Sequence, residues 1–127
     1  MGRPANHRSF LAKRVQAKLV LESDNGPTTP EADPILAKNE ILACPDFLAN
    51  AGGVTVSYSE QVQNAYMFYC DAEEVYARLD KKMTTAFKSA WDARGKYRCT
   101  MGQAAYVVAV GRVAEAVKMR GIVTTQS

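Results

Sequence analysis

Two short apolar runs carry the strand signals of this sequence, and they limit what it can fold into. The first run, from Val15 to Leu21, alternates with the two-residue period of a strand, and apolar Val20 indicates that both faces are covered. The second run, Ile41 to Cys44, is stopped by Pro45. Two strands make a poor sheet on their own. We therefore expect the remaining strands of the sheet to come from elsewhere.

A short helix is predicted between these two strands. The turn residues Ser23 to Pro27 follow the first strand, and Pro30 then fits a first helical position. A threonine before Pro30 can supply the N-cap oxygen, and the helix should end near Lys38. A strand, a helix and a strand in this order form a βαβ unit, which normally implies parallel strands and a right-handed crossover.

Three helical patterns follow Gly52-Gly53, the second ending near Gly95. Capping boxes are expected from Asp71 to Glu74 and from Thr100 to Gln103. The predicted buried faces are Val54, Tyr58, Val62, Ala65 and Tyr69 in the first helix; Val75, Leu79, Met83, Ala86, Phe87, Ala90 and Trp91 in the second; and Ala105, Val108, Ala109, the stem of Arg112, Val113, Ala116 and Val117 in the third.

The sequence thus predicts an α/β fragment, mostly helical, in which a strand–helix–strand unit with an incomplete sheet precedes three helices. Its 127 residues allow one domain at most. We divide the chain into a basic N-terminal arm (1–14), a folded module (15–122) and a tail (123–127). Apolar side chains from Tyr66 to Tyr69 surround too much of a helix for one buried face, which indicates a surface for a protein partner.

The net charge of +3 is concentrated at the N-terminus. An acid-free, basic start is typical of an organellar targeting segment, which would end before about Val15, and equally of a solvated arm that could contact an acidic surface. Nucleic-acid binding is not favoured, because no basic motif or reading helix follows. No apolar run is long enough for a membrane span. The basic residues concerned are Arg3, Arg8, Lys13, Arg14 and Lys18.

Cysteine and histidine usage argues against a metal site. Cys44, Cys70 and Cys99 form no Cys-x-x-Cys pair, which favours reduced thiols in a cytoplasmic or mitochondrial-matrix compartment. His7 is the one histidine, so a zinc site is not expected.

Two turn-rich stretches, DNGPTTPEAD and NAGGVTVSY, each follow a predicted strand and precede a helix. Ligands of open α/β sheets bind where such loops gather. Asn25 and Asn50 could recognise an amide or a hydroxyl there, and Gly52-Gly53 would let a ligand approach the backbone. From composition alone, plain tight turns explain the same residues more simply.

Other enzyme signals are missing from the chain. It contains no Gly-x-Gly-x-x-Gly turn and no Ser–His–Asp or Cys–His grouping beyond His7. Asp46 and Glu60 are possible acid–base groups, but helix-cap or surface roles explain them as simply.

Four blocks in this order, NGPTTPEAD, PDFLANAGGVTVSY, EEVYARLDKKM and AAYVVAVGRVAEAVKMRG, resemble the C-terminal part of the hexameric glutamate dehydrogenases. The resemblance runs from about Val15 to about Ile122. It implies that the chain matches the end of the Rossmann-like cofactor-binding domain, including its last strands, and the helices that return toward the substrate domain.

The resemblance also implies roles for four residues. Asn25 and Asn50 match asparagines beside the nicotinamide end of the cofactor, whereas Val54 and Ser57 match residues that contact glutamate. The family's catalytic lysine and aspartate, its lysine-rich substrate loop and its glycine-rich cofactor turn all precede the matched region.

Several positions depart from the family pattern. Glu22-Ser23-Asp24-Asn25 stands where the family has Glu-Gly-Ala-Asn, and Asn39-Glu40 replaces Arg-Gly. Ser59 and Gln61 replace two large aromatic residues, and Gly102-Gln103 replaces a pair that includes a basic residue.

Two functions are consistent with these features. The first is a non-catalytic module that serves as a structural or interaction subunit of a larger assembly, with the four matched residues as relics and no cofactor bound. The second is one piece of a split glutamate dehydrogenase, which performs NAD(P)-linked oxidative deamination of glutamate to 2-oxoglutarate and ammonia and shares those four residues. A lone nucleotide-binding regulator is a further alternative. In neither of the first two is the chain an enzyme by itself.

Overall fold

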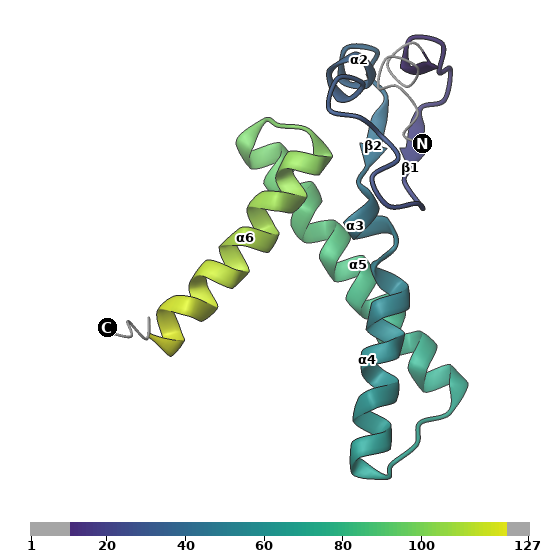
Figure 1. Cartoon of the computed structure of the whole chain (residues 1–127), viewed down its shortest axis with the longest axis vertical. Coiled ribbons are helices and arrows are strands. Elements are labelled where there is room, and N and C mark those ends of the chain that lie inside the picture. The colour runs from purple at the N-terminus through teal and green to yellow at the C-terminus, as the bar shows by residue number, and fades with distance from the viewer. Residues whose placement is uncertain (1–10, 122–127) are drawn as a thin grey trace, which may run out of the picture.

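The computed structural model describes residues 11–121 of the chain. Two parallel strands pair in the register Leu19 to Leu42 and Leu21 to Cys44, which confirms the predicted strand–helix–strand unit. Helices make up most of the remainder (Figure 1). The elements are β1 (Leu19–Leu21), α2 (Asp33–Lys38), β2 (Leu42–Cys44), α3 (Asp46–Ala49), α4 (Ala51–Tyr66), α5 (Ala72–Tyr97) and α6 (Met101–Arg120).

The strands are shorter than predicted. In β1 the side chain that packs inward is Val20, and not Leu19 or Leu21. Val20 is half-buried, whereas Leu19 and Leu21 are 53% and 59% exposed. The prediction that both faces of this strand are covered is therefore wrong for the chain alone. Val20 packs against the small cluster beneath α2, and the described residues supply no equivalent cover for the two leucines.

Helix α2 starts later than Pro30 and without the predicted threonine cap. Its N-cap is Ala32, and no side chain caps it. Instead, the main-chain carbonyl of Thr29 accepts the N–H groups of Ala32 and Asp33. Pro34 lies in the first turn, where a proline costs no hydrogen bond. The helix ends at Lys38 as predicted.

Two small apolar clusters form the core. One lies between α2 and the strands and includes Leu36 and Ile41. The other joins β2 and α3 to the helices α5 and α6. Its buried members are Cys44, Leu48, Ala90, Met101 and Ala105.

Helix α5 buries the predicted stripe most completely, with Ala90 fully buried and Val75, Leu79, Met83 and Ala86 half-buried, although Phe87 and Trp91 stay more exposed. It continues past Gly95 to Tyr97 and ends at Arg98, whose φ is 51°. Figure 1 shows α4 running alongside α5.

The predicted buried face of α4 is wrong for the chain alone, and that of α6 is buried only in part. Val54 and Tyr58 are exposed, and Tyr69 lies beyond the end of α4. Helix α6 contacts α5 through its first turns, and Figure 1 shows it then diverging from α5. As a result Ala105 is buried and Val108 and Ala116 are half-buried, but Ala109, Val113 and Val117 are exposed.

Of the two predicted capping boxes, the one at Thr100 forms completely and the one at Asp71 forms in half, because the Glu74 carboxylate accepts from Arg78 and not from the Asp71 N–H. Thr100 and Gln103 make the two reciprocal hydrogen bonds of a capping box. Asp71 accepts the N–H of Glu74 at the start of α5.

The predicted basic arm reaches into the described residues. Ala12 is 5% exposed and packs in the cluster beneath α2, so this end of the arm is held by the fold. The predictions on His7, the rest of the arm and the tail concern residues 1–10 and 122–127, outside the described range. Within 11–121, no helix combines the length and apolar character of a membrane span.

Candidate functional site

The two loops that leave β1 and β2 meet at one edge of the sheet. Because the strands are parallel, their carboxyl ends point the same way, and this is the edge where ligands bind in α/β folds. The side-chain amide of Asn50 donates to the side-chain oxygen of Asn25 across 3.3 Å. Both asparagines are exposed. The two residues predicted to lie beside a cofactor are therefore direct neighbours.

A second set of hydrogen bonds holds the same loops together behind the asparagines. Asp46, the first residue of α3, accepts the N–H of Gly26 at Oδ2 over 2.7 Å. Its own N–H donates to Oε2 of Glu22 over 3.0 Å. Glu22 is 9% exposed, so its carboxylate is sheltered at the end of β1. Gly26, next to Asn25, is thereby tied to Asp46, at the start of the helix that leads to Asn50.

The sheltered carboxylate of Glu22 changes the electrostatics around it. Burial raises the pKa of the Asp33 carboxyl, and the charge of Glu22 raises it further. The same two causes raise the pKa of the Cys44 thiol. This end of the sheet therefore disfavours additional negative charge.

The two residues predicted to contact glutamate lie on α4. Asn50 precedes this helix as its N-cap, and Val54 and Ser57 follow four and seven residues later. That spacing puts all three on one face of the helix. Val54 is 69% exposed and Ser57 is exposed as well. This face continues the surface on which Asn25 and Asn50 meet.

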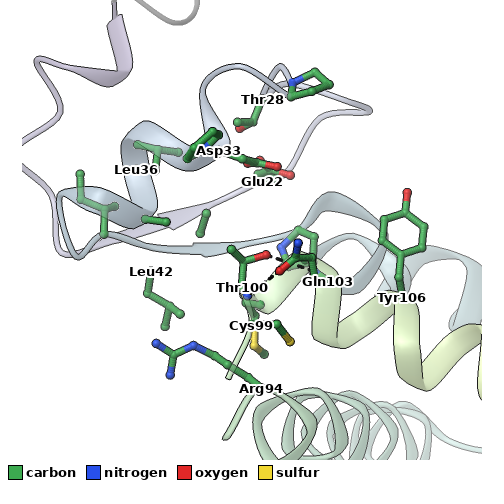
Figure 2. Close-up of a pocket in the computed structure, with 18 of the residues that line it drawn as sticks. Glu22, Thr28, Asp33, Leu36, Leu42, Arg94, Cys99, Thr100, Gln103 and Tyr106 are labelled. Atoms are coloured by element: carbon green, nitrogen blue, oxygen red, sulfur yellow. Dashed lines mark hydrogen bonds between the residues drawn. The ribbon is translucent and has the colours of Figure 1, made fainter. Parts of the chain in front are cut away.

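A large open hollow lies between the strand–helix–strand unit and the start of α6, and Glu22, Gly26 and Asp46 are among the residues that line it. It has a volume of about 1050 Å³. In Figure 2, Glu22, Thr28 and Asp33 lie on one side of the hollow, and Thr100, Gln103 and Tyr106 lie on the other. None of the four predicted site residues lines it. The hollow is formed by the packing of β2 against α6, a contact between distant segments that the sequence did not reveal.

Comparison with known proteins identifies the family. Residues 6–121 match the model of the Glutamate/Leucine/Phenylalanine/Valine dehydrogenase family. The chain belongs to this dehydrogenase family. The resemblance inferred from the four sequence blocks is therefore confirmed.

Sequence relatives are glutamate dehydrogenases. The NAD-specific enzyme of Clostridioides difficile is 50% identical over 111 residues, which are 87% of this chain and 26% of that enzyme. The glutamate dehydrogenase of Thermotoga maritima is 52% identical over 111 residues, which are 87% of this chain and 27% of that enzyme. The chain thus spans about a quarter of the length of these relatives.

Solved structures of glutamate dehydrogenases share the fold. The enzyme of Peptoniphilus asaccharolyticus superposes with a TM-score of 0.84 at 42% identity, covering 89% of this chain and 28% of that one. The hetero-hexameric enzyme of Thermus thermophilus, in a leucine-bound form, gives a TM-score of 0.85 at 30% identity, covering 91% of this chain and 28% of that one. The strand–helix–strand unit and its helices therefore form a fragment of the glutamate dehydrogenase fold.

Sequence reasoning did not find the pair formed by Glu22 and Asp46. The sequence predicts an acid–base, helix-cap or surface role for Asp46 and no role for Glu22 beyond its place in a loop that departs from the family pattern. The sequence signal for this pair is the position of each acid within two residues of the end of a strand, where side chains from both loops converge.

Proposed function

We propose that this chain is the portion of a glutamate dehydrogenase that supplies one wall of the cofactor and substrate site. Asn25 and Asn50 would lie beside the nicotinamide of NAD(P), and Val54 and Ser57 would contact glutamate. The reaction is the oxidative deamination of glutamate to 2-oxoglutarate and ammonia. The observation that carries this proposal is the hydrogen bond between Asn50 and Asn25, because it places residues from two separate loops at one point.

The open surface of the chain supports the view that further protein completes the site. Among residues 11–121, large apolar side chains such as Val54, Tyr58 and Val113 are exposed. The exposed leucines of β1 lie on the face of the sheet that the described residues leave uncovered, where a further layer would pack. The catalytic lysine and aspartate and the glycine-rich cofactor turn would come from that further protein, in the same polypeptide or in another.

A second candidate function is a non-catalytic structural or interaction module of a larger assembly. It is favoured by Asp24, whose carboxylate accepts the N–H of Asn25 over 2.9 Å. The family has alanine at this position. This carboxylate adds a negative charge next to the asparagine pair, where the nicotinamide end of the cofactor would lie.

A graft separates the two candidates. Residues 11–121 would replace the matching segment of the NAD-specific glutamate dehydrogenase of Clostridioides difficile. We expect the hybrid to reduce NAD⁺ in the presence of glutamate. Asn50→Ala should then raise the KM for NAD⁺, and Ser57→Ala should raise the KM for glutamate while leaving that for NAD⁺ unchanged.

A matched variant tests the second candidate in the same hybrid. Ser23→Gly combined with Asp24→Ala restores the family sequence beside Asn25. A hybrid that assembles normally but gains activity only with these two changes would support the non-catalytic module and contradict the first proposal.

We further propose that the chain works in a reducing compartment, because Cys44, Cys70 and Cys99 are all free thiols. The relatives are bacterial enzymes and give no support to a mitochondrial location. Thiol titration of the chain in a lysate prepared with alkylating agent tests this proposal. Recovery of a disulfide would contradict it.

A further inference from the structure

Asp46 connects to both asparagines of the proposed site. Its carboxylate accepts the N–H of Gly26, the residue directly after Asn25. Its main-chain carbonyl accepts the N–H of Asn50 over 2.8 Å, through the single turn of α3.

Glu22 fixes Asp46 from behind. Its carboxylate accepts the Asp46 N–H, and its own N–H donates to the carbonyl of Cys44 over 3.1 Å, which continues the pairing of β1 with β2. A sheltered carboxylate that accepts a main-chain N–H has few other orientations. The strand ends, Glu22 and Asp46 therefore form one connected path to the asparagine pair.

We infer that Asp46, supported by Glu22, is a positioning residue that holds Asn25 and Asn50 in register to receive the nicotinamide end of the cofactor. The inference rests on the proposed function for its catalytic meaning, but the geometry it describes belongs to the chain itself. The exposed asparagines share a single hydrogen bond of 3.3 Å, which alone would hold two loop side chains only weakly. The bonds through Asp46, at 2.7 Å and 2.8 Å, are the shorter ones.

The first test uses the full chain without any ligand. Amide hydrogen exchange of Gly26 is followed by NMR in the parent, in Asp46→Ala and in Asp46→Asn. Asp46→Ala should speed exchange at Gly26 by about tenfold and shift the side-chain amide signals of Asn50, because the acceptor is lost. Asp46→Asn keeps an oxygen that can accept the Gly26 N–H, so it should restore most of the protection.

Asp71→Ala is the matched control. Asp71 also uses its carboxylate to accept a main-chain N–H at the start of a helix, α5, but it has no bond to either asparagine loop. This variant should lose helix stability and leave the Gly26 exchange unchanged. If Asp46→Ala also leaves Gly26 exchange and the Asn50 signals unchanged, the inference is overturned.

The second test uses the glutamate dehydrogenase hybrid. Misplacing the asparagines should raise the KM for NAD⁺ on the order of tenfold in Asp46→Ala, with a smaller effect on the KM for glutamate. Glu22→Gln keeps an acceptor for the Asp46 N–H and should change the KM for NAD⁺ far less than Glu22→Ala. If Asp46 had a purely structural role, Asp46→Ala would lower the amount of active enzyme and change neither KM value. That result would overturn the inference.

The two proposals fail separately. An inactive parent hybrid would contradict the proposed function, while Gly26 exchange in the chain would still decide whether Asp46 sets the geometry of the pair. If the hybrid is active but Asp46→Ala leaves its KM for NAD⁺ unchanged, the inference is contradicted and the proposed function is not.

Discussion

Glu40 holds a left-handed backbone conformation, with φ at 56°. Its N–H donates to the carbonyl of Ala37, and the next N–H, of Ile41, donates to the carbonyl of Leu36. These two bonds form a Schellman motif at the end of α2, and its usual apolar contact is present because Leu36 and Ile41 belong to one buried cluster. Glycine suits this position best, and the family pattern has glycine here.

Replacing Glu40 by glycine should therefore stabilise the chain. A side chain in the left-handed region costs about 1 kcal/mol or somewhat more, so we expect Glu40→Gly to raise the free energy of unfolding in urea by about 1 kcal/mol, less the added entropy of the unfolded chain. Asn39→Gly is the control, because φ at Asn39 is −85° and glycine gains nothing there. Equal effects of the two variants would contradict the prediction.

Cys44 should make stability depend on alkaline pH. Burial, and then the charge of Glu22, raises the pKa of this thiol above the 9.0 of a free thiol. Above that pH the unfolded chain loses a proton that the folded chain keeps, so the free energy of unfolding falls as the pH rises toward the folded pKa. Between about pH 8 and about pH 10, Cys44→Ala should lose less stability than the parent in urea unfolding. Identical losses would show that Cys44 does not contribute.

At this scale the sequence predicted one half of the candidate site. Asn25 and Asn50 could be predicted as neighbours because each lies in a turn-rich stretch that follows a strand, and parallel strands bring such stretches together, whereas their roles at a cofactor came from the family resemblance. The bond between Asp46 and Glu22 could not, because it joins residues 24 positions apart and depends on the orientation of α3. No local sequence pattern predicts the orientation of α3.

At the scale of elements, the start of α6 depends on its capping box. The Thr100 hydroxyl accepts the N–H of Gln103, and the Gln103 side chain accepts the N–H of Thr100. Met101, Ala104 and Ala105 in the same turns are buried against α5 and β2. The cap therefore fixes the part of α6 that belongs to the core.

Thr100→Ala should cost about 1 kcal/mol of stability, because an N-cap oxygen is lost. Thr100→Ser keeps the oxygen and should unfold close to the parent in urea. The same loss in both variants would mean that the methyl group, and not the hydrogen bond, stabilises this turn.

Helical periodicity predicted α5 well and the burial of α4 and α6 poorly, for one physical reason. A periodic apolar face shows that a helix is buried somewhere, but not by which segment. Helix α5 is contacted by both α4 and α6 within this chain, so its stripe is covered. The faces of α4 and α6 that carry Val54, Tyr58 and Val113 have no partner among the described residues. The error in burial thus identifies surfaces that the proposed assembly would cover.

At the scale of the whole molecule, two small clusters hold together a chain whose helices diverge. Figure 1 shows α6 directed away from α4 and α5, so its outer turns gain no cover from them. Val110 and Val113 there are 62% and 64% exposed. Contiguous exposed apolar side chains of this kind mark surfaces that bind other protein. The divergence of α6 therefore agrees with a module that is completed by other parts of a dehydrogenase.

A paired substitution tests this interpretation of α6. In the chain alone, Val110→Ser with Val113→Ser should leave the free energy of unfolding nearly unchanged, since both side chains already face water, and should reduce self-association in analytical ultracentrifugation. In the hybrid the same change should lower stability by about 1.5 to 3 kcal/mol per valine that becomes buried. Ala105→Ser is the matched control, because Ala105 is buried within the chain, so this change should destabilise both proteins. If the valine pair destabilised the isolated chain as much as the hybrid, α6 would owe its stability to contacts within the chain, and the proposed surface would be wrong.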